Sequence, residues 1–186
     1  MSEKNENDMK QVTLGDKTFE VAIPESDILK SVKKCADNIS ADYAGKNPIC
    51  VVVLNGAFIF ASDLLRMLSV PCEVAFTKIS SYEGTTSTQT IREHFPISED
   101  ISGRHVIIVE DIVESGYSMQ FLTERLKEHN PASIEICALF HKPEQCKVPG
   151  LNIKYVGMEL PEAFIVGYGL DYDQKGRFLR DIYSLV

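Results

Sequence analysis

The sequence predicts an α/β protein in which a mostly parallel, twisted sheet is flanked by helices. Several short apolar runs are continuous and rich in β-branched residues, which is typical of strands buried on both faces. Segments with helical periodicity separate these runs, and this alternation favours βαβ units. The 186 residues, 44% of them hydrophobic, are enough to bury one core. We therefore expect a single domain over residues 1–186.

The first half of the chain is expected to alternate helix and strand. Apolar residues recur every three or four positions over 24–43, which predicts an amphipathic helix. The run ICVVVL at 49–54 predicts a buried strand, and helical character follows over 58–68. VAFTKI at 74–79 predicts the next strand.

The second half continues this alternation. HVIIV at 105–109 predicts a third strand, and a helix is expected over 118–129. Further strands are expected at IEICALF (134–140), NIKYVGM (152–158) and FIVGY (164–168).

Two segments lack both kinds of periodicity. Residues 1–10 are polar and charged, and we expect them to be disordered. Residues 80–102 are polar, rich in Ser and Thr and too long for a plain connector, so we expect a flexible lid loop there. A disordered excursion or an exposed hairpin is the alternative for this segment.

Composition excludes several classes of protein. The chain has 19 Lys and Arg against 27 Asp and Glu, and this net charge of −8 argues against a non-specific nucleic-acid binder. No apolar run approaches the roughly 20 residues of a membrane-spanning helix. The five cysteines form no CxxC pair and have no His at metal-ligand spacing, which is typical of free thiols in a cytosolic protein. We expect a cytoplasmic protein that binds neither nucleic acid nor membranes.

Polar or small residues follow each of the first four predicted strands. They are Asn55-Gly56 after the first, the long polar loop after the second, an acidic turn after the third and His141-Lys142 after the fourth. In parallel sheets, ligands bind at the carboxyl ends of the strands. The pattern therefore predicts a binding site at this edge of the sheet.

The acidic turn combines negative charge with a segment suited to phosphate. Glu110, Asp111 and Glu114 are followed by Ser115-Gly116-Tyr117-Ser118, which opens a predicted helix. Exposed amides, two hydroxyls and the helix dipole suit a phosphate monoester at this helix start. The carboxylates could accept hydrogen bonds from sugar hydroxyls or hold Mg²⁺ through its waters. The alternative is a solvated acidic loop, in which adjacent like charges beside a buried strand would be unfavourable.

The stretch VIIVEDIVESGYSM (106–119) resembles the phosphoribosyl pyrophosphate (PRPP) signature of the type I phosphoribosyltransferases. Its double acid, with a third acid three residues after Asp111, resembles the version in the hypoxanthine-guanine phosphoribosyltransferases. The resemblance covers about residues 49–177 in five separated motifs. It implies the type I phosphoribosyltransferase fold with a small hood and a flexible catalytic loop. It also implies Mg²⁺ as cofactor and a homodimer or homotetramer.

The activity implied by this resemblance belongs to purine salvage. The 5-phosphoribosyl group of PRPP would pass to N9 of hypoxanthine or guanine, and the products would be IMP or GMP and pyrophosphate. A regulatory protein that senses PRPP or a nucleotide and binds nucleic acid is the alternative. Such a regulator should show a basic face, and the net charge of −8 argues against one.

The resemblance also implies roles for residues around PRPP. Glu110 and Asp111 match the acids that bind the ribose 2′- and 3′-hydroxyls. Arg177 matches an arginine that reaches the pyrophosphate side. The 5′-phosphate loop is matched by Ser115, Gly116, Tyr117 and Ser118, the pyrophosphate loop by Leu54, Asn55 and Gly56, and the Ser-Tyr pair of the catalytic loop by Ser81 and Tyr82. The family often has a cis peptide at the start of its pyrophosphate loop, and some members have Lys where this chain has Asn55.

A further set of residues matches the purine side of the family's site. Lys142 matches the lysine that hydrogen-bonds the purine 6-oxo group, and Phe164 the aromatic residue that stacks on the base. Ile165 matches a residue whose backbone lines the purine edge. Asp171 matches an acid that binds Mg²⁺ near the base, so the implied metal residues are Asp171, Glu110 and Asp111.

Glu114 is a departure from the family pattern. It matches the acid beside purine N7, a candidate general base, where the family usually has the shorter Asp. A base must come within about 2.6–3.2 Å of the proton that it handles. Glu114 could bend back to reach N7, could reach it through a water, or could leave proton transfer to solvent.

Overall fold

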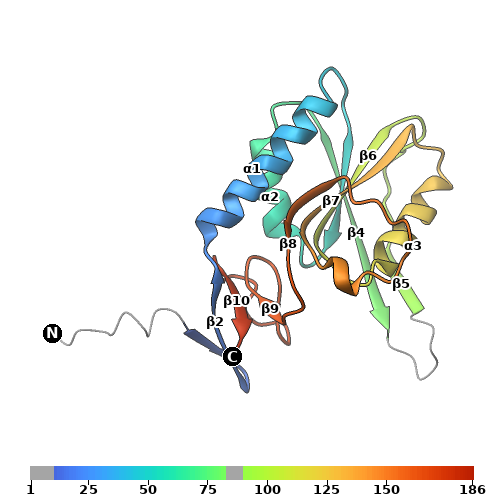
Figure 1. Cartoon of the computed structure of the whole chain (residues 1–186). Helices are drawn as coiled ribbons and strands as arrows, with labels where there is room; N and C mark the ends of the chain where they lie inside the picture. The colour runs from blue at the N-terminus through green and yellow to red at the C-terminus, as the bar shows by residue number, and fades with distance from the viewer. Residues whose placement is uncertain (1–10, 83–89) are drawn as a thin grey trace.

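A six-stranded, mostly parallel sheet forms the centre of the molecule (Figure 1). The computed structural model describes residues 11–82 and 90–186. The strand order is β5-β4-β3-β6-β7-β8. Neighbouring strands are parallel except for the antiparallel pair β4 and β5. The strands are β3 (Ile49–Leu54), β4 (Glu73–Tyr82), β5 (Thr90–Phe95), β6 (His105–Val113), β7 (Ser133–His141) and β8 (Tyr155–Glu159).

Helices cover both faces of this sheet. Helices α1 (Glu25–Asp42) and α2 (Phe58–Met67) pack on one face, and α3 (Tyr117–Lys127) packs on the other. The side chains of β3 alternate between the two resulting cores: Cys50 and Val52 lie with α1 and α2, while Ile49, Val51 and Val53 lie with α3. This two-sided burial explains the continuous apolar run of β3, and it confirms the predicted fold class.

A small second sheet forms the hood that the family resemblance implied. Its strand order is β1-β2-β10-β9, and all three pairs are antiparallel. The strands are β1 (Gln11–Leu14), β2 (Lys17–Ile23), β9 (Ile165–Val166) and β10 (Ile182–Leu185). The hood brings the start of the described chain beside its C-terminus (Figure 1). Phe19, Leu14 and Val166 form its buried core.

The ends of some strands differ from the predictions. Strand β6 continues to Val113 because Ile112 and Val113 pair with β7, so the acidic pair lies within the strand and not in the turn after it. The strand predicted at 152–158 begins at Tyr155. The strand predicted at 164–168 is restricted to Ile165–Val166, because the next three residues have positive φ angles.

The expectation of one long loop over 80–102 was wrong for part of this segment. Residues 80–82 extend β4, and β5 (Thr90–Phe95) pairs with it antiparallel. This pairing satisfies backbone N–H and C=O groups of β4 that would otherwise lie at a sheet edge. The described ends therefore agree with the hairpin alternative, and residues 83–89 lie outside the described part. The disorder expected over 1–10 also concerns residues outside that part.

Among the described residues, no helix combines the length and apolar character needed to cross a membrane.

Candidate active site at the carboxyl edge of the sheet

The structure brings the predicted polar motifs together at one edge of the central sheet. Strand β3 ends at Leu54 and leads into the Asn55-Gly56 turn, while β6 beside it carries the acidic pair near its end. Strand β7 lies on the other side of β6, and Val113 of β6 is paired with His141 of β7. The backbone N–H of Lys142 donates to the carbonyl oxygen of Val113 at 2.9 Å. Parallel pairing thus places motifs far apart in the sequence side by side.

The turn after β3 has no room for a side chain at Gly56. The peptide bond between Leu54 and Asn55 is cis, as in many members of the family that the sequence resembles. A Cβ atom on Gly56 would overlap Oδ2 of Asp111. A Cβ atom on Gly169 would in turn overlap the carbonyl oxygen of Gly56. The turn is therefore held between the acidic pair and the C-terminal segment, while the side chain of Asn55 is exposed.

Asp111 of the acidic pair is buried and Glu110 beside it is partly buried, although both residues carry carboxyl groups. Asp111 is only 8% exposed, and its Oδ1 accepts a hydrogen bond from the Ile112 N–H at 2.9 Å. Oε2 of Glu110 is buried and has no hydrogen-bond partner among the described residues. Burial and the neighbouring Asp111 raise the pKa of Glu110 well above its usual range. Burial likewise raises the pKa of Asp111 to about 6. A cation or hydroxyl donor would satisfy such a buried carboxylate.

A polar cavity lies between the acidic pair and the start of α3. Its volume is about 120 Å³, and it is lined by Glu110, Ile112, Val113, Glu114, Ser115, Gly116, Ser118 and Met119. Gly116 precedes the first residue of α3, Tyr117, and has a left-handed φ of 83°. A Cβ atom on Gly116 would come within 2.8 Å of Leu151, so packing as well as backbone conformation requires glycine there. The cavity thus faces the N-terminal turn of a helix, which attracts anions.

Lys142 and Glu114 form an ion pair that sequence reasoning did not find. Lys142 follows β7 and precedes the short 3-10 helix η2 (Pro143–Gln145). Its ammonium group contacts the carboxylate of Glu114 and donates to the carbonyl oxygen of Ala163 at 2.7 Å. The Lys142 side chain is 5% exposed, whereas that of Glu114 is 47% exposed. This burial shows that Lys142 is not a solvated surface amine.

The C-terminal segment carries a second ion pair and an exposed aromatic ring. Arg177 pairs with Asp171 at 2.6 Å and donates to the carbonyl oxygen of Gly169 at 2.7 Å. Phe164 is 45% exposed and directly precedes Ile165, the first residue of β9.

Three neighbours of Phe164 were missed by sequence reasoning. Phe19 lies 6.1 Å from it and Tyr172 lies 5.8 Å from it, measured between ring centroids. The ammonium group of Lys17 lies 4.5 Å from the Tyr172 ring centroid. No local signal marks Lys17 or Phe19 as site residues, because the hood fold alone brings β2 to Phe164. Tyr172, by contrast, directly follows Asp171, which the family resemblance had already indicated.

Ser81 and Tyr82 are the last two residues of β4 and pair with Ile91 and Thr90 of β5. Their side chains are outside the described part of the structure, so only their position at the end of the strand is established.

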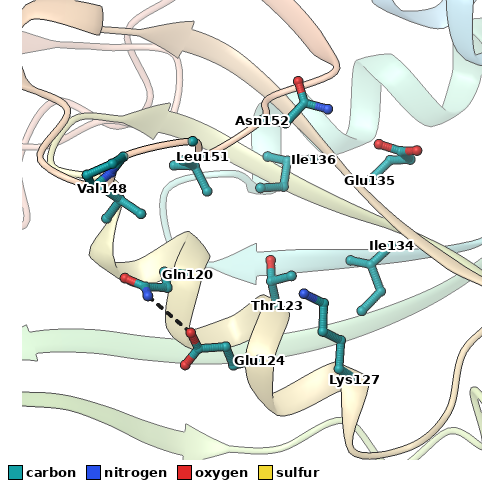
Figure 2. Close-up of a pocket in the computed structure, with 12 residues that line it drawn as sticks. Gln120, Thr123, Glu124, Lys127, Ile134, Glu135, Ile136, Val148, Leu151 and Asn152 are labelled. Carbon is teal, nitrogen blue, oxygen red and sulfur yellow. Dashed lines mark hydrogen bonds between the residues drawn. The ribbon is translucent and has the colours of Figure 1, made fainter.

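A larger cavity lies away from these residues, against α3 and β7 (Figure 2). Its volume is about 310 Å³, and none of the predicted site residues lines it. Its wall includes the hydrogen-bonded pair Gln120 and Glu124 and the apolar side chains of Ile134, Ile136 and Leu151. Cavity volume alone would therefore favour this second cavity as the binding site. The acidic pair and the two ion pairs, however, lie at the carboxyl edge of the sheet.

Comparison with known proteins establishes the family. Residues 24–173 match the family model described as "Phosphoribosyl transferase domain". The chain belongs to this family. It is similar to the hypoxanthine phosphoribosyltransferase of Haemophilus influenzae, with 36% identity over 171 residues that cover 90% of this chain and 95% of that protein. It is also similar to the hypoxanthine-guanine phosphoribosyltransferase of Streptococcus pneumoniae, with 37% identity over 175 residues, 94% of this chain and 92% of that protein.

A solved structure supports the assignment of this chain to the phosphoribosyl transferase family. The crystal structure of a hypoxanthine-guanine phosphoribosyltransferase from Bacillus anthracis superimposes with a TM-score of 0.86 at 38% identity. The match covers 90% of this chain and 98% of that one. The family resemblance inferred from the motifs is confirmed, and the chain is a phosphoribosyltransferase.

The buried acids of the phosphoribosyl transferase predict an unusual pH dependence of stability. Their folded pKa values lie above the unfolded ones, so the folded protein binds more protons, and the free energy of unfolding falls as pH rises from about 4 to 6. Asp111→Asn removes one charge and should raise the free energy of unfolding at pH 7 by up to about 3 kcal/mol. This gain should disappear as pH falls toward 3.8, the ordinary value for Asp.

Denaturant unfolding between pH 4 and 7 measures this difference. Asp173→Asn is a suitable control because the Asp173 side chain is 80% exposed, and it should leave stability nearly unchanged at every pH. A gain for Asp111→Asn that is absent at pH 7, or equal at both ends of the range, would contradict the buried charge.

Proposed function

We propose that this protein transfers the 5-phosphoribosyl group of PRPP to N9 of hypoxanthine or guanine, giving IMP or GMP and pyrophosphate. The observation that carries the proposal is the acidic pair of partly buried Glu110 and buried Asp111, which lies between a glycine turn and a helix-start cavity. A ligand with a sugar diol and two anionic groups fits this order of groups. The names of the relatives, which are hypoxanthine or hypoxanthine-guanine phosphoribosyltransferases, support the same substrates.

On the PRPP side, three sets of residues bind three different parts of the ligand. Glu110 and Asp111 accept hydrogen bonds from the ribose hydroxyls. The segment Ser115–Ser118, with the N-terminal turn of α3, binds the 5′-phosphate through backbone amides and hydroxyls. The Leu54-Asn55-Gly56 turn offers its backbone amides to pyrophosphate, and Arg177 adds a positive charge nearby.

The donor set fits Mg²⁺, which we propose as the cofactor. Mg²⁺ takes oxygen ligands and is commonly held by one or two carboxylates together with substrate phosphates and water. The described residues include no group of three or more acidic, His or Cys side chains that could hold an ion by themselves, so substrate oxygens would complete the shell. Glu110, Asp111 and Asp171 would hold the metal, and the orphaned Oε2 of Glu110 supports this role. Bound Mg²⁺ supplies positive charge that balances the departing pyrophosphate.

On the base side, Lys142 selects a 6-oxopurine. Its ammonium group only donates hydrogen bonds, which suits a 6-oxo acceptor, whereas the 6-amino group of adenine would place donor against donor. The exposed face of Phe164 stacks on the base, and the backbone of Ile165 lines its edge. Glu114 is in contact with Lys142, and we propose that it accepts the proton of the purine N7.

The chemical step gains from groups that are fixed before the reaction. Positive charge develops on the ribose and negative charge on pyrophosphate in an oxocarbenium-like transition state. Backbone amides of the Gly56 turn are held in place to meet the growing negative charge, which is electrostatic preorganisation. Ser81 and Tyr82, at the end of the β4–β5 hairpin, belong to a lid that excludes water from the activated sugar.

The regulatory alternative finds no support. The relatives named above are transferases, and the chain retains Lys142, Phe164 and Asp171 together with a net charge of −8. We further propose a cytoplasmic homodimer or homotetramer. The exposed side chains of Phe76 on β4 and Phe95 on β5 support a surface for subunit contact, because large apolar side chains are usually covered.

An absorbance assay of IMP formation tests the proposal directly. The protein should convert hypoxanthine and PRPP to IMP only when Mg²⁺ is present, and adenine should not replace hypoxanthine. In calorimetry, the double variant Glu110→Ala/Asp111→Ala should bind PRPP more weakly by a few kcal/mol, because hydrogen bonds to charged groups contribute about 1.5–3 kcal/mol each.

Removal of two exposed acids, Glu124 on α3 and Glu128 directly after it, provides the matched control for charge. Glu124→Ala/Glu128→Ala should leave PRPP binding unchanged, since neither side chain lies at the carboxyl edge of the sheet. Unchanged PRPP affinity in the Glu110/Asp111 variant would remove the assignment of the acidic pair. A nucleic-acid shift at low salt without IMP formation would favour the regulatory alternative instead.

Glu114 provides a test of proton transfer. Glu114→Gln removes the proton acceptor and should lower the rate of the chemical step at least about 10-fold, within the range typical of general acid–base catalysis. Glu114→Asp should retain much of the activity, because the family usually has Asp at this position. Single-turnover rates are the measurement of choice, because slow product release can hide a chemical defect.

The exposed Glu144, two residues after Lys142, offers a control in Glu144→Gln, which should behave like the wild type. A wild-type chemical rate in Glu114→Gln would show that Glu114 is no base and only completes the charge around the sugar.

A further inference from the structure

The glycine turn after β3 is in direct contact with the segment 167–169 near the C-terminus. The α-carbon of Gly169 lies so close to the carbonyl oxygen of Gly56 that a Cβ atom would overlap it. On its other side, Gly56 is equally close to the carboxylate of Asp111. The position of the turn therefore depends on where segment 167–169 lies.

This segment has an uncommon backbone conformation. Gly167, Tyr168 and Gly169 have φ angles of 102°, 47° and 104°. A tyrosine in the left-handed region is unfavourable unless tertiary contacts hold it there. Two backbone bonds contribute: the Tyr168 N–H donates to Leu179 at 2.8 Å, and the Gly169 N–H donates to Arg177 at 3.0 Å.

The side chain of Tyr168 provides the link to the rest of the site. It is 2% exposed, and its hydroxyl donates to Oδ2 of Asp63 at 2.5 Å. Asp63 belongs to α2, the helix that begins two residues after Gly56. Burial raises the pKa of the Tyr168 hydroxyl, which therefore stays protonated and remains a donor. The bond joins segment 167–169 to the same helix that continues from the glycine turn.

The same segment is also bound to a charged side chain at this end of the site. Arg177 donates to the carbonyl oxygen of Gly169 at 2.7 Å and pairs with Asp171 at 2.6 Å. A shift of segment 167–169 would consequently move the glycine turn and this ion pair together. Displacements of about 1 Å can be costly where binding groups are preorganised.

We infer that Tyr168 and Asp63 are positioning residues for the pyrophosphate end of the site. Their hydrogen bond holds segment 167–169 against α2. Because Gly169 is in contact with Gly56, the position of this segment in turn sets the position of the glycine turn. The inference rests on the proposed assignment of the Asn55-Gly56 turn to pyrophosphate. Neither residue touches the ligand in this account.

A second tyrosine–aspartate bond in the molecule separates positioning from general stability. The hydroxyl of Tyr155 on β8 donates to Oδ2 of Asp42 on α1 at 2.7 Å, and Tyr155 is 3% exposed. It resembles the Tyr168–Asp63 bond in chemistry and burial but includes no residue of the proposed site. Tyr155→Phe is therefore a matched control for Tyr168→Phe.

The experiment measures the dissociation constant of pyrophosphate by calorimetry with Mg²⁺ present, for the full-length protein. Tyr168→Phe should weaken pyrophosphate binding about tenfold, which corresponds to about 1.4 kcal/mol. Tyr155→Phe should bind pyrophosphate like the wild type, even where its midpoint of thermal unfolding falls by a similar amount. The KM for PRPP should rise in parallel for Tyr168→Phe only.

Variants of Asp63 repeat the test from the other partner. Asp63→Asn keeps an oxygen that accepts from Tyr168 and should restore most of the affinity that Asp63→Ala loses. The double variant Tyr168→Phe/Asp63→Ala should be no weaker than either single variant, because both remove the same bond. The Asp63 series decides the question if Tyr168→Phe does not fold.

Two results would overturn the inference. One is equal pyrophosphate affinity in Tyr168→Phe, Asp63→Ala and the wild type. The other is an equal loss in Tyr168→Phe and Tyr155→Phe, which would make the effect one of general stability. A wild-type protein that neither binds pyrophosphate nor forms IMP would instead show that the proposed function itself is wrong.

Discussion

The close packing around Gly56 is the constraint on which the rest of the site depends. Its α-carbon faces the carboxylate of Asp111, and its carbonyl oxygen faces the backbone of Gly169, with no space for a methyl group at either glycine. Three separate parts of the chain, the ends of β3 and β6 and the segment after β9, therefore meet at one residue. Dense packing of this kind transmits small displacements, so a shift of the turn, of the acids or of the C-terminal ion pair would displace the other two.

The edge of the sheet carries two kinds of charged group: the carboxyl groups of Glu110 and Asp111, and the ammonium group of Lys142. Partly buried Glu110 and buried Asp111 have raised pKa values, which means that the protein alone disfavours their ionised forms. Lys142, by contrast, is buried but neutralised by Glu114. A ligand that brings a cation and a diol to the first pair and a 6-oxo acceptor to Lys142 complements this arrangement. In the proposed function, binding and the choice of base depend on groups that the fold has already removed from water, above all Asp111 and Lys142.

Local pattern predicted the elements whose burial is regular. The helix expected at 24–43 is α1 (Glu25–Asp42), and the strand expected at 49–54 is β3, since each pattern records one constant environment along the element. Predictions failed where the environment changes within an element. Strand β6 runs on through two acids because β7 continues to pair with it, and β5 pairs with residues expected in a loop. Of the hood strands, β9 was expected from the sequence, whereas β1, β2 and β10 were not located, because they lie near opposite ends of the chain and pair only in the folded protein.

Local motifs in the sequence indicated the chemical groups of the site. The motifs at the strand ends contain the acids, the phosphate-type turn and the lysine that point to the family. Which of these groups are in contact with one another depends on the tertiary fold. The Lys142–Glu114 pair joins residues 28 positions apart, and the Tyr168–Asp63 bond joins residues 105 apart. Lys17 and Phe19 reach the surroundings of Phe164 through the hood alone. Such contacts leave no local signal, because each partner satisfies its own segment's pattern and their meeting depends on how strands and sheets are paired.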